Sequence, residues 1–105
     1  SDDYLDNVGN GVIFDGDFSS FSRLTLILLG VGQFTPTFPR NAMIINDGEE
    51  IETGPMSGVP IYGYRVGLFR DTDGTLKTTV KLINYSDGTE SDAVLQCNYI
   101  VIGIK

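Results

Sequence analysis

The chain has 105 residues, of which 41% are hydrophobic, and its formal net charge is −7. This length fits a single domain, and a lone Cys97 with no histidine excludes an intrachain disulfide and a structural zinc site. Because so acidic a chain repels phosphate groups, we expect neither nucleic-acid binding nor membrane insertion.

Four Asp-Gly pairs divide the chain, and each lies beside a run rich in β-branched, aromatic or leucine residues. Asp-Gly is favoured in two-residue hairpin turns, where both central residues take a positive φ. The pattern predicts an all-β, antiparallel two-sheet sandwich of the jelly-roll or TNF-like kind, with about seven to eight short strands. The pairs are Asp15-Gly16, Asp47-Gly48, Asp73-Gly74 and Asp87-Gly88.

The first ten residues are acidic and polar, and we interpret 1–10 as a leader or linker before a single β-sandwich domain at 11–105. Because the chain opens at Ser1 without an initiator methionine, we expect a processed protein or a fragment of a longer one. Residues 11–14 predict a short first strand ahead of the first Asp-Gly turn.

The apolar run 21–29 is rich in leucine, so propensity alone leaves helix and strand both open. The run is short and two glycines follow it closely, so we predict a buried strand. It is also too short to span a membrane. Pro36 and Pro39 then predict an extended or edge segment over 31–39.

The middle of the chain alternates short strands with loops. Residues 41–46 predict a brief strand before the second Asp-Gly turn. We interpret the three glutamates that follow as a solvated, charged turn, and residues 54–60, with two prolines, as a loop. The glutamates are Glu49, Glu50 and Glu52.

Period-two alternation is clearest in the last part of the chain. Residues 61–70 and 76–85 each predict a strand with one buried and one wet face. Asp-Gly turns are expected to join them to each other and to a last strand at 93–105 as a meander. Gly63 and Gly67 repeat on one face of the first of these strands. They mark a place where another segment or a bulky side chain approaches the backbone closely.

The final strand is apolar on both faces from Tyr99 onward. Such a strand is covered on both sides. The opposing sheet supplies one cover, and a loop, the N-terminal arm or another subunit supplies the second. We predict a subunit contact, because a small domain has to hide such a surface. The residues expected at this contact are Ile100, Ile102 and Ile104.

Side chains suited to catalysis are scarce. With no histidine to act as its base, Cys97 is interpreted as a buried apolar residue, and we expect no enzyme and no cofactor. The carboxylates at 49, 50 and 52 leave a small hydrolase as one alternative. Residues 71–74 resemble the start of a calcium loop, but Leu82 stands where its last glutamate belongs. We therefore predict a hairpin turn there and no metal.

Two stretches suggest a family. The segment Phe34-Thr-Pro-Thr-Phe38-Pro39-Arg40-Asn41 runs into an apolar strand, and the chain closes on Tyr99-Ile-Val-Ile-Gly103-Ile-Lys. Together they resemble the carboxy-terminal knob domains of bacteriophage tail fibres and tail needles. The resemblance implies an all-β homotrimer at the tip of a stalk on the virion tail, outside the cell. Such a knob contacts the host surface and catalyses nothing.

We therefore expect a non-enzymatic homotrimeric knob that binds a glycan or protein receptor on the host cell surface, in attachment or penetration. The alternative is a monomeric carbohydrate-binding or adhesion module of a larger secreted protein. The loops at 47–52 and 54–60 are expected to face the receptor, and Tyr85 is the best candidate for an exposed aromatic. The candidate receptor-binding residues are Tyr85, Glu49, Glu50 and Met56.

Overall fold

A computed structural model describes residues 6–31, 41–56 and 61–105, and every regular element in this part of the chain is a β-strand. These residues include no helix long and apolar enough to cross a membrane. The predicted segment at 31–39 lies, apart from its first residue, outside the described residues. The strands are β1 (Asp6–Val8), β2 (Gly11–Phe14), β3 (Arg23–Val31), β4 (Asn41–Asn46), β5 (Glu49–Glu52), β6 (Tyr62–Arg70), β7 (Leu76–Asn84), β8 (Glu90–Asp92) and β9 (Leu95–Ile104).

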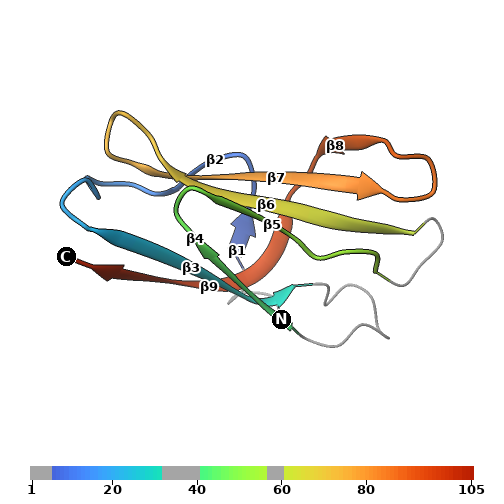
Figure 1. The fold of residues 1–105 in the computed structure, drawn as a ribbon, viewed down its shortest axis with the longest axis horizontal. Coiled ribbons are helices and arrows are strands. Elements are labelled where there is room, and N and C mark those ends of the chain that lie inside the picture. The colour runs from blue at the N-terminus through green and yellow to red at the C-terminus, as the bar shows by residue number, and fades with distance from the viewer. Residues whose placement is uncertain (1–5, 32–40, 57–60) are drawn as a thin grey trace.

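The strands form two antiparallel sheets in two layers (Figure 1). A four-stranded sheet has the order β1-β9-β3-β4, and a five-stranded sheet has the order β2-β7-β6-β5, with β8 also beside β7. The predicted two-sheet sandwich is therefore confirmed, with nine strands among the described residues.

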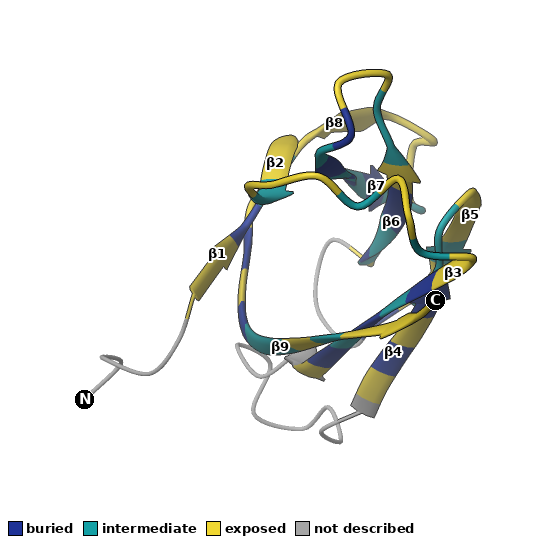
Figure 2. Ribbon diagram, turned by 90° about the vertical axis from the view of Figure 1, so that its left-hand side faces the viewer, coloured by how far each residue is buried: buried dark blue, intermediate teal, exposed yellow. Residues whose placement is uncertain are grey.

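The core lies between the sheets because the longer strands, such as β3 and β7, bury alternate side chains. Leu24, Leu26 and Leu28 of β3 are buried in one cluster with Val66 and Leu68 of β6. Figure 2 shows buried segments on strands of both layers. The leucine-rich run is a strand because β4 and β9 flank it on both edges and satisfy its backbone hydrogen bonds.

The chain passes between the sheets at both edges of the sandwich. It crosses from β1 to β2, returns from β2 to β3, and returns again from β8 to β9. The crossing from β4 to β5 joins the edge strands at the other side of the two sheets. At the crossing from β4 to β5, the Asp47 amide donates to the Leu24 carbonyl at 2.9 Å, and the Gly48 amide donates to the Leu68 carbonyl at 2.7 Å. The Asp47-Gly48 turn is thus bonded to both sheets.

Arg70 forms a clamp at this crossing. Its Nε donates to Asp47 Oδ2 at 3.0 Å, and its NH1 donates to the carbonyls of Phe18 and Phe21 at 3.2 and 2.5 Å. Asp47 Oδ1 in turn accepts the Leu24 N–H at 3.0 Å. One guanidinium therefore joins the end of β6, the β4–β5 turn and the loop that leads into β3.

The expected linker is partly wrong, because Asp6–Val8 belongs to the domain. These residues form β1, in which Asp6 pairs with Cys97 and Val8 with Leu95. Val8 is buried in the core. A single apolar residue in a polar segment thus gains enough burial to hold the segment against the sheet.

The predicted meander is also partly wrong. Strands β6, β7 and β8 follow one another in the five-stranded sheet, but β9 lies between β1 and β3 in the other sheet. The exposed residues of β8 pair with β7 at the edge, which suits their polarity. The first residues of β9, Leu95–Cys97, pair with β1, and its more apolar part, residues 98–104, pairs with β3.

The Asp-Gly turns differ from the predicted type. No described non-glycine residue has a positive φ, whereas Gly74 and Gly88 have φ of 86° and 78°. The aspartates contribute through their carboxylates. Asp73 Oδ1 accepts the Thr75 N–H at 2.9 Å and the Thr75 hydroxyl at 2.6 Å. These two bonds lower the pKa of Asp73.

Cys97 is a buried thiol, as predicted. Burial, with a smaller contribution from Asp6, raises its pKa to about 11. Because the thiolate is the reactive form, we expect iodoacetamide at about pH 8 to leave the folded protein unmodified and to alkylate Cys97 in urea. Mass spectrometry measures the adduct. Rapid alkylation of the folded protein at the same pH would contradict the placement of this residue.

Candidate functional site

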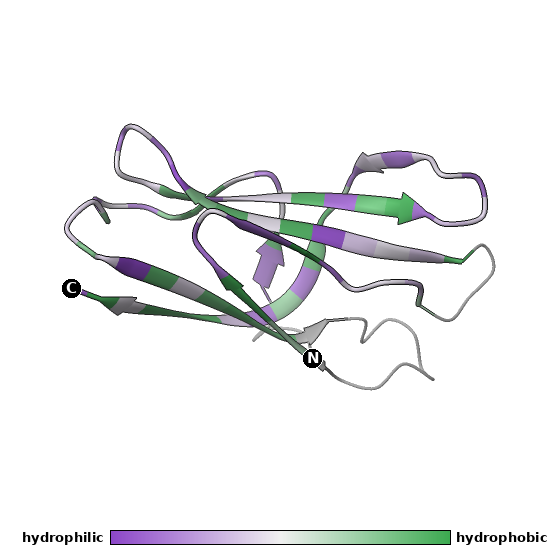
Figure 3. Ribbon diagram, viewed as in Figure 1, coloured by the Kyte–Doolittle hydropathy of each residue, from purple (hydrophilic) through white to green (hydrophobic). Residues whose placement is uncertain are grey.

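The two sheets present different outer faces. Figure 3 shows hydrophobic residues along β9 toward its C-terminal end, whereas hydrophilic and hydrophobic residues alternate along β6 and β7. The outer face of the four-stranded sheet carries a set of exposed isoleucines. The outer face of the five-stranded sheet carries charged groups around a hollow.

An isoleucine row crosses the four-stranded sheet. Ile27 lies directly opposite Ile44 of β4 and Ile100 of β9, so one row spans three strands. Ile44 is 58% exposed, Ile100 and Ile102 are each 49% exposed, and Ile104 is 51% exposed. We call this surface the isoleucine face and define it as Ile27, Ile44, Ile100, Ile102 and Ile104.

Only one side of β9 is covered by the described residues. On its inner side Tyr99 and Val101 pack against the core, as predicted for the side facing the opposing sheet. On its outer side the isoleucines are exposed. The N-terminal arm, from Asp6 to Val8, pairs with Leu95–Cys97 at the start of β9 and not with the residues that carry the exposed isoleucines. The subunit contact stays a prediction.

The isoleucine face carries little charge. Outward positions on β3, β4 and β9 alternate with the buried ones, and within the described ranges none of them is an aspartate or glutamate. Arg23, opposite Ile104, is the only charged residue among them. The carboxylates of this acidic chain are therefore concentrated away from the face.

A hollow of about 380 Å³ lies on the other side of the sandwich, over Gly67. Gly67 pairs with Glu50 of β5 and Thr79 of β7. A Cβ atom at Gly67 would lie 2.6 Å from Thr79 Oγ1 and 3.1 Å from Glu50 Cγ. Gly67 is itself buried, and the absence of a side chain leaves room for the Glu50 and Thr79 side chains to lie over it.

One end of the hollow is aromatic and the other is charged. Phe69 lies at the first end and is 38% exposed. Arg65 and Lys81, paired across β6 and β7, lie at the other. Lys81 Nζ contacts Asp92 Oδ1 at 2.6 Å, so its charge is neutralised by a neighbour.

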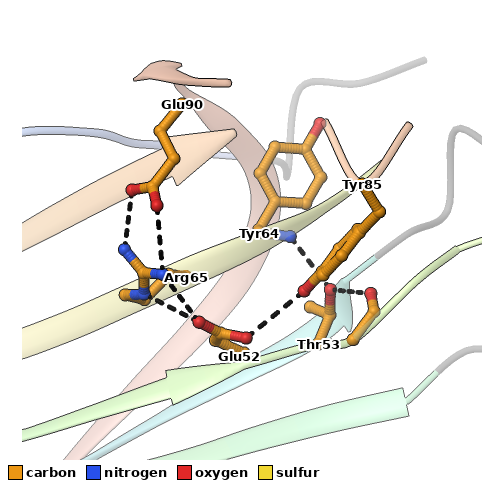
Figure 4. Close-up of polar contacts among 7 residues, drawn as sticks. Glu52, Thr53, Tyr64, Arg65, Tyr85 and Glu90 are labelled. Atoms are coloured by element: carbon orange, nitrogen blue, oxygen red, sulfur yellow. Dashed lines mark hydrogen bonds and ion pairs between the residues drawn. The ribbon is translucent and has the colours of Figure 1, made fainter. Parts of the chain in front are cut away.

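Arg65 joins two glutamates beside the hollow (Figure 4). Its NH1 lies 2.7 Å from Glu90 Oε1, and its NH2 lies 2.8 Å from Glu52 Oε1. The hydrogen bonds to Glu90 and Glu52 raise the pKa of Arg65. The Tyr85 hydroxyl donates to Glu52 Oε2 at 3.3 Å. Burial and the Glu52 carboxylate raise the pKa of the Tyr85 phenol.

Gly63 confirms the close approach expected at this position. A Cβ atom there would meet the Gly54 carbonyl oxygen, and it would lie 2.7 Å from Thr53 Oγ1. Thr53 Oγ1 also accepts the Tyr64 N–H at 2.9 Å (Figure 4). The backbone after β5 thus packs directly on β6.

The predicted receptor residues have different positions in the structure. Glu49 and Glu50 are exposed, but they form strand β5 and not the predicted turn. Tyr85 is only partly exposed. Met56 was expected on an exposed loop, and this is wrong: it is 2% exposed, and it bridges Tyr62. Burial of its apolar side chain holds this part of the loop against β6. Residues 57–60 lie outside the described ranges.

Sequence reasoning missed Phe69 and Thr79 as binding candidates. Both lie on the predicted wet faces of 61–70 and 76–85, and an aromatic residue on a wet face was the available signal. It also missed Ile27 and Ile44, whose outward position on the four-stranded sheet depends on the register of three strands.

The described residues include no group of three His, Cys, Asp or Glu side chains placed to hold a metal ion. Asp71 and Asp73, in the predicted hairpin turn, form ion pairs with Lys77. No family model, curated protein or solved structure matches this chain.

Proposed function

We propose that this chain is a non-enzymatic attachment domain that assembles as a homotrimer, as the knob of a phage tail fibre or needle does. The isoleucine face is the observation that carries the proposal. Contiguous exposed apolar patches of this kind mark interaction sites on proteins. Because isoleucine is β-branched and stiff, its side chains lose little conformational entropy when a partner covers them.

Charge supports a second copy of the chain as the occupant of this face. With a net charge of −7, copies repel one another across most of their surface. Outward carboxylates are missing from the described positions of the isoleucine face, so like chains meet there without that penalty. A basic partner would find better complementarity on the acidic five-stranded sheet.

Assembly through this face orients the opposite sheet. The five-stranded sheet of each copy then points away from the contact and offers its hollow to the surroundings. Several weak sites on one rigid assembly bind a surface more tightly than one site does. Such a domain attaches a virion tail to a host cell, and its place is the tail, outside the cell.

Light scattering coupled to size exclusion tests the proposal. We expect a mass three times that of the 11.4 kDa chain, because each copy buries its isoleucine face against the others. Dilution series show whether the assembly dissociates. A mass of one chain at high protein concentration would contradict the proposal.

A monomeric adhesion module is the second candidate. The observation that favours it is the hollow over Gly67, which a single chain completes by itself. If this candidate is correct, the protein has the solution mass of one chain and still binds its ligand at the hollow.

A further inference from the structure

We propose that the hollow over Gly67 binds a neutral carbohydrate, as the receptor-contacting site of the proposed attachment domain. This inference rests on the proposed function for its biological setting, but the site itself belongs to one chain. It would give the acidic face of the sandwich a ligand and leave the isoleucine face for assembly.

The hollow contains three groups that the described fold leaves unused. The Phe69 ring makes no ring contact with another described aromatic residue. The Glu50 carboxylate and the Thr79 hydroxyl make no hydrogen bond or ion pair with the described residues, although both side chains lie beside Gly67. The described fold makes no polar contact with these side chains, whereas a ligand in the hollow gains contacts with all of them.

These groups match the two sides of a pyranose ring. One face of the sugar carries C–H bonds, which stack on an aromatic ring such as Phe69. Its hydroxyls donate to a carboxylate in charge-assisted bonds, here Glu50, and exchange hydrogen bonds with a hydroxyl, here Thr79. The volume of about 380 Å³ lies within the range of small-molecule sites.

The charges exclude an anionic ligand. The two cations at the hollow, Arg65 and Lys81, are already paired with carboxylates. Glu49 and Glu50 add further negative charge at its rim. Phosphate, sulfate and acidic sugars therefore meet a repulsive field. A neutral polyol does not, because its hydroxyls need acceptors rather than counter-charges.

The test uses the labelled full chain on an array of neutral, sialylated and sulfated glycans, followed by titration with the best neutral oligosaccharide. We expect binding to neutral glycans. Phe69→Ala and Glu50→Gln are each expected to weaken it at least about tenfold, the loss of one stacking contact or charge-assisted bond. Ile61→Ala is the matched control, because Ile61 is 46% exposed and lies outside the hollow.

Several outcomes would overturn the inference: no glycan bound, a preference for acidic glycans, or neutral binding that neither variant weakens. Urea midpoints of all variants verify that they stay folded. The mass of the same samples separates the two proposals. A monomer that binds glycan would contradict only the proposed assembly. A trimer that binds no glycan would contradict only the proposed carbohydrate site at the hollow.

Discussion

Replacing Ile44 and Ile100 together with lysine is expected to convert the proposed trimer into a folded monomer of 11.4 kDa. The two residues flank Ile27 in one row across the sheet. Burying two unpaired ammonium groups in an apolar contact costs several kcal/mol, about enough to abolish a contact of this size. Both side chains point outward, so the core is unchanged. Light scattering coupled to size exclusion measures the mass.

The matched control for this variant is Val12→Lys combined with Ile61→Lys. Val12 is 51% exposed and Ile61 is 46% exposed, and neither belongs to the isoleucine face. The control adds the same charge and is expected to keep the mass of the unmodified protein. If the Ile44 and Ile100 variant kept that mass while its circular dichroism spectrum stayed native, the isoleucine face would not be the assembly contact.

Arg70→Met is expected to lower the free energy of unfolding by about 2–3 kcal/mol. Methionine keeps much of the apolar stem but loses the bonds to Asp47 and to the carbonyls of Phe18 and Phe21. The side chains of Arg70 and Asp47 are 25% and 18% exposed, so water only partly replaces these bonds. Because the affected turn is bonded to both sheets, losing the Arg70 bonds weakens the contact between the sheets as well as the turn itself.

Arg65→Met is the comparison for the clamp, because Arg65 also bonds two partners. Its glutamates are 44% and 41% exposed, and exposed ion pairs contribute less than about 1 kcal/mol. Urea unfolding at constant protein concentration measures both variants. If both variants lost the same free energy of unfolding, the bonds of Arg70 would stabilise the fold no more than the exposed ion pairs of Arg65 do.

Local sequence was sufficient for the long strands and for the side that each of them buries, whereas it missed the short strands β1, β5 and β8. Alternation over 61–70 and 76–85, and the leucine run at 21–29, predict strands that the structure contains, because period two arises within one strand. The exposed Ile100, Ile102 and Ile104 follow from the same alternation along β9. The burial of Cys97 does too.

The partners of each strand, and with them both candidate sites, depend on the tertiary structure. The four-stranded sheet takes β9 from the expected meander because its apolar residues gain more beside the leucine-rich β3, where Tyr99 and Val101 pack against the core, than at the polar edge that β8 occupies. Only that placement brings Ile44 to Ile100 across Ile27. Likewise, Glu50, Gly67 and Thr79 form one hollow through the register of three strands. Side-chain pattern along a chain carries no record of register between strands that are distant in sequence, so these contacts arise only when the sheets assemble.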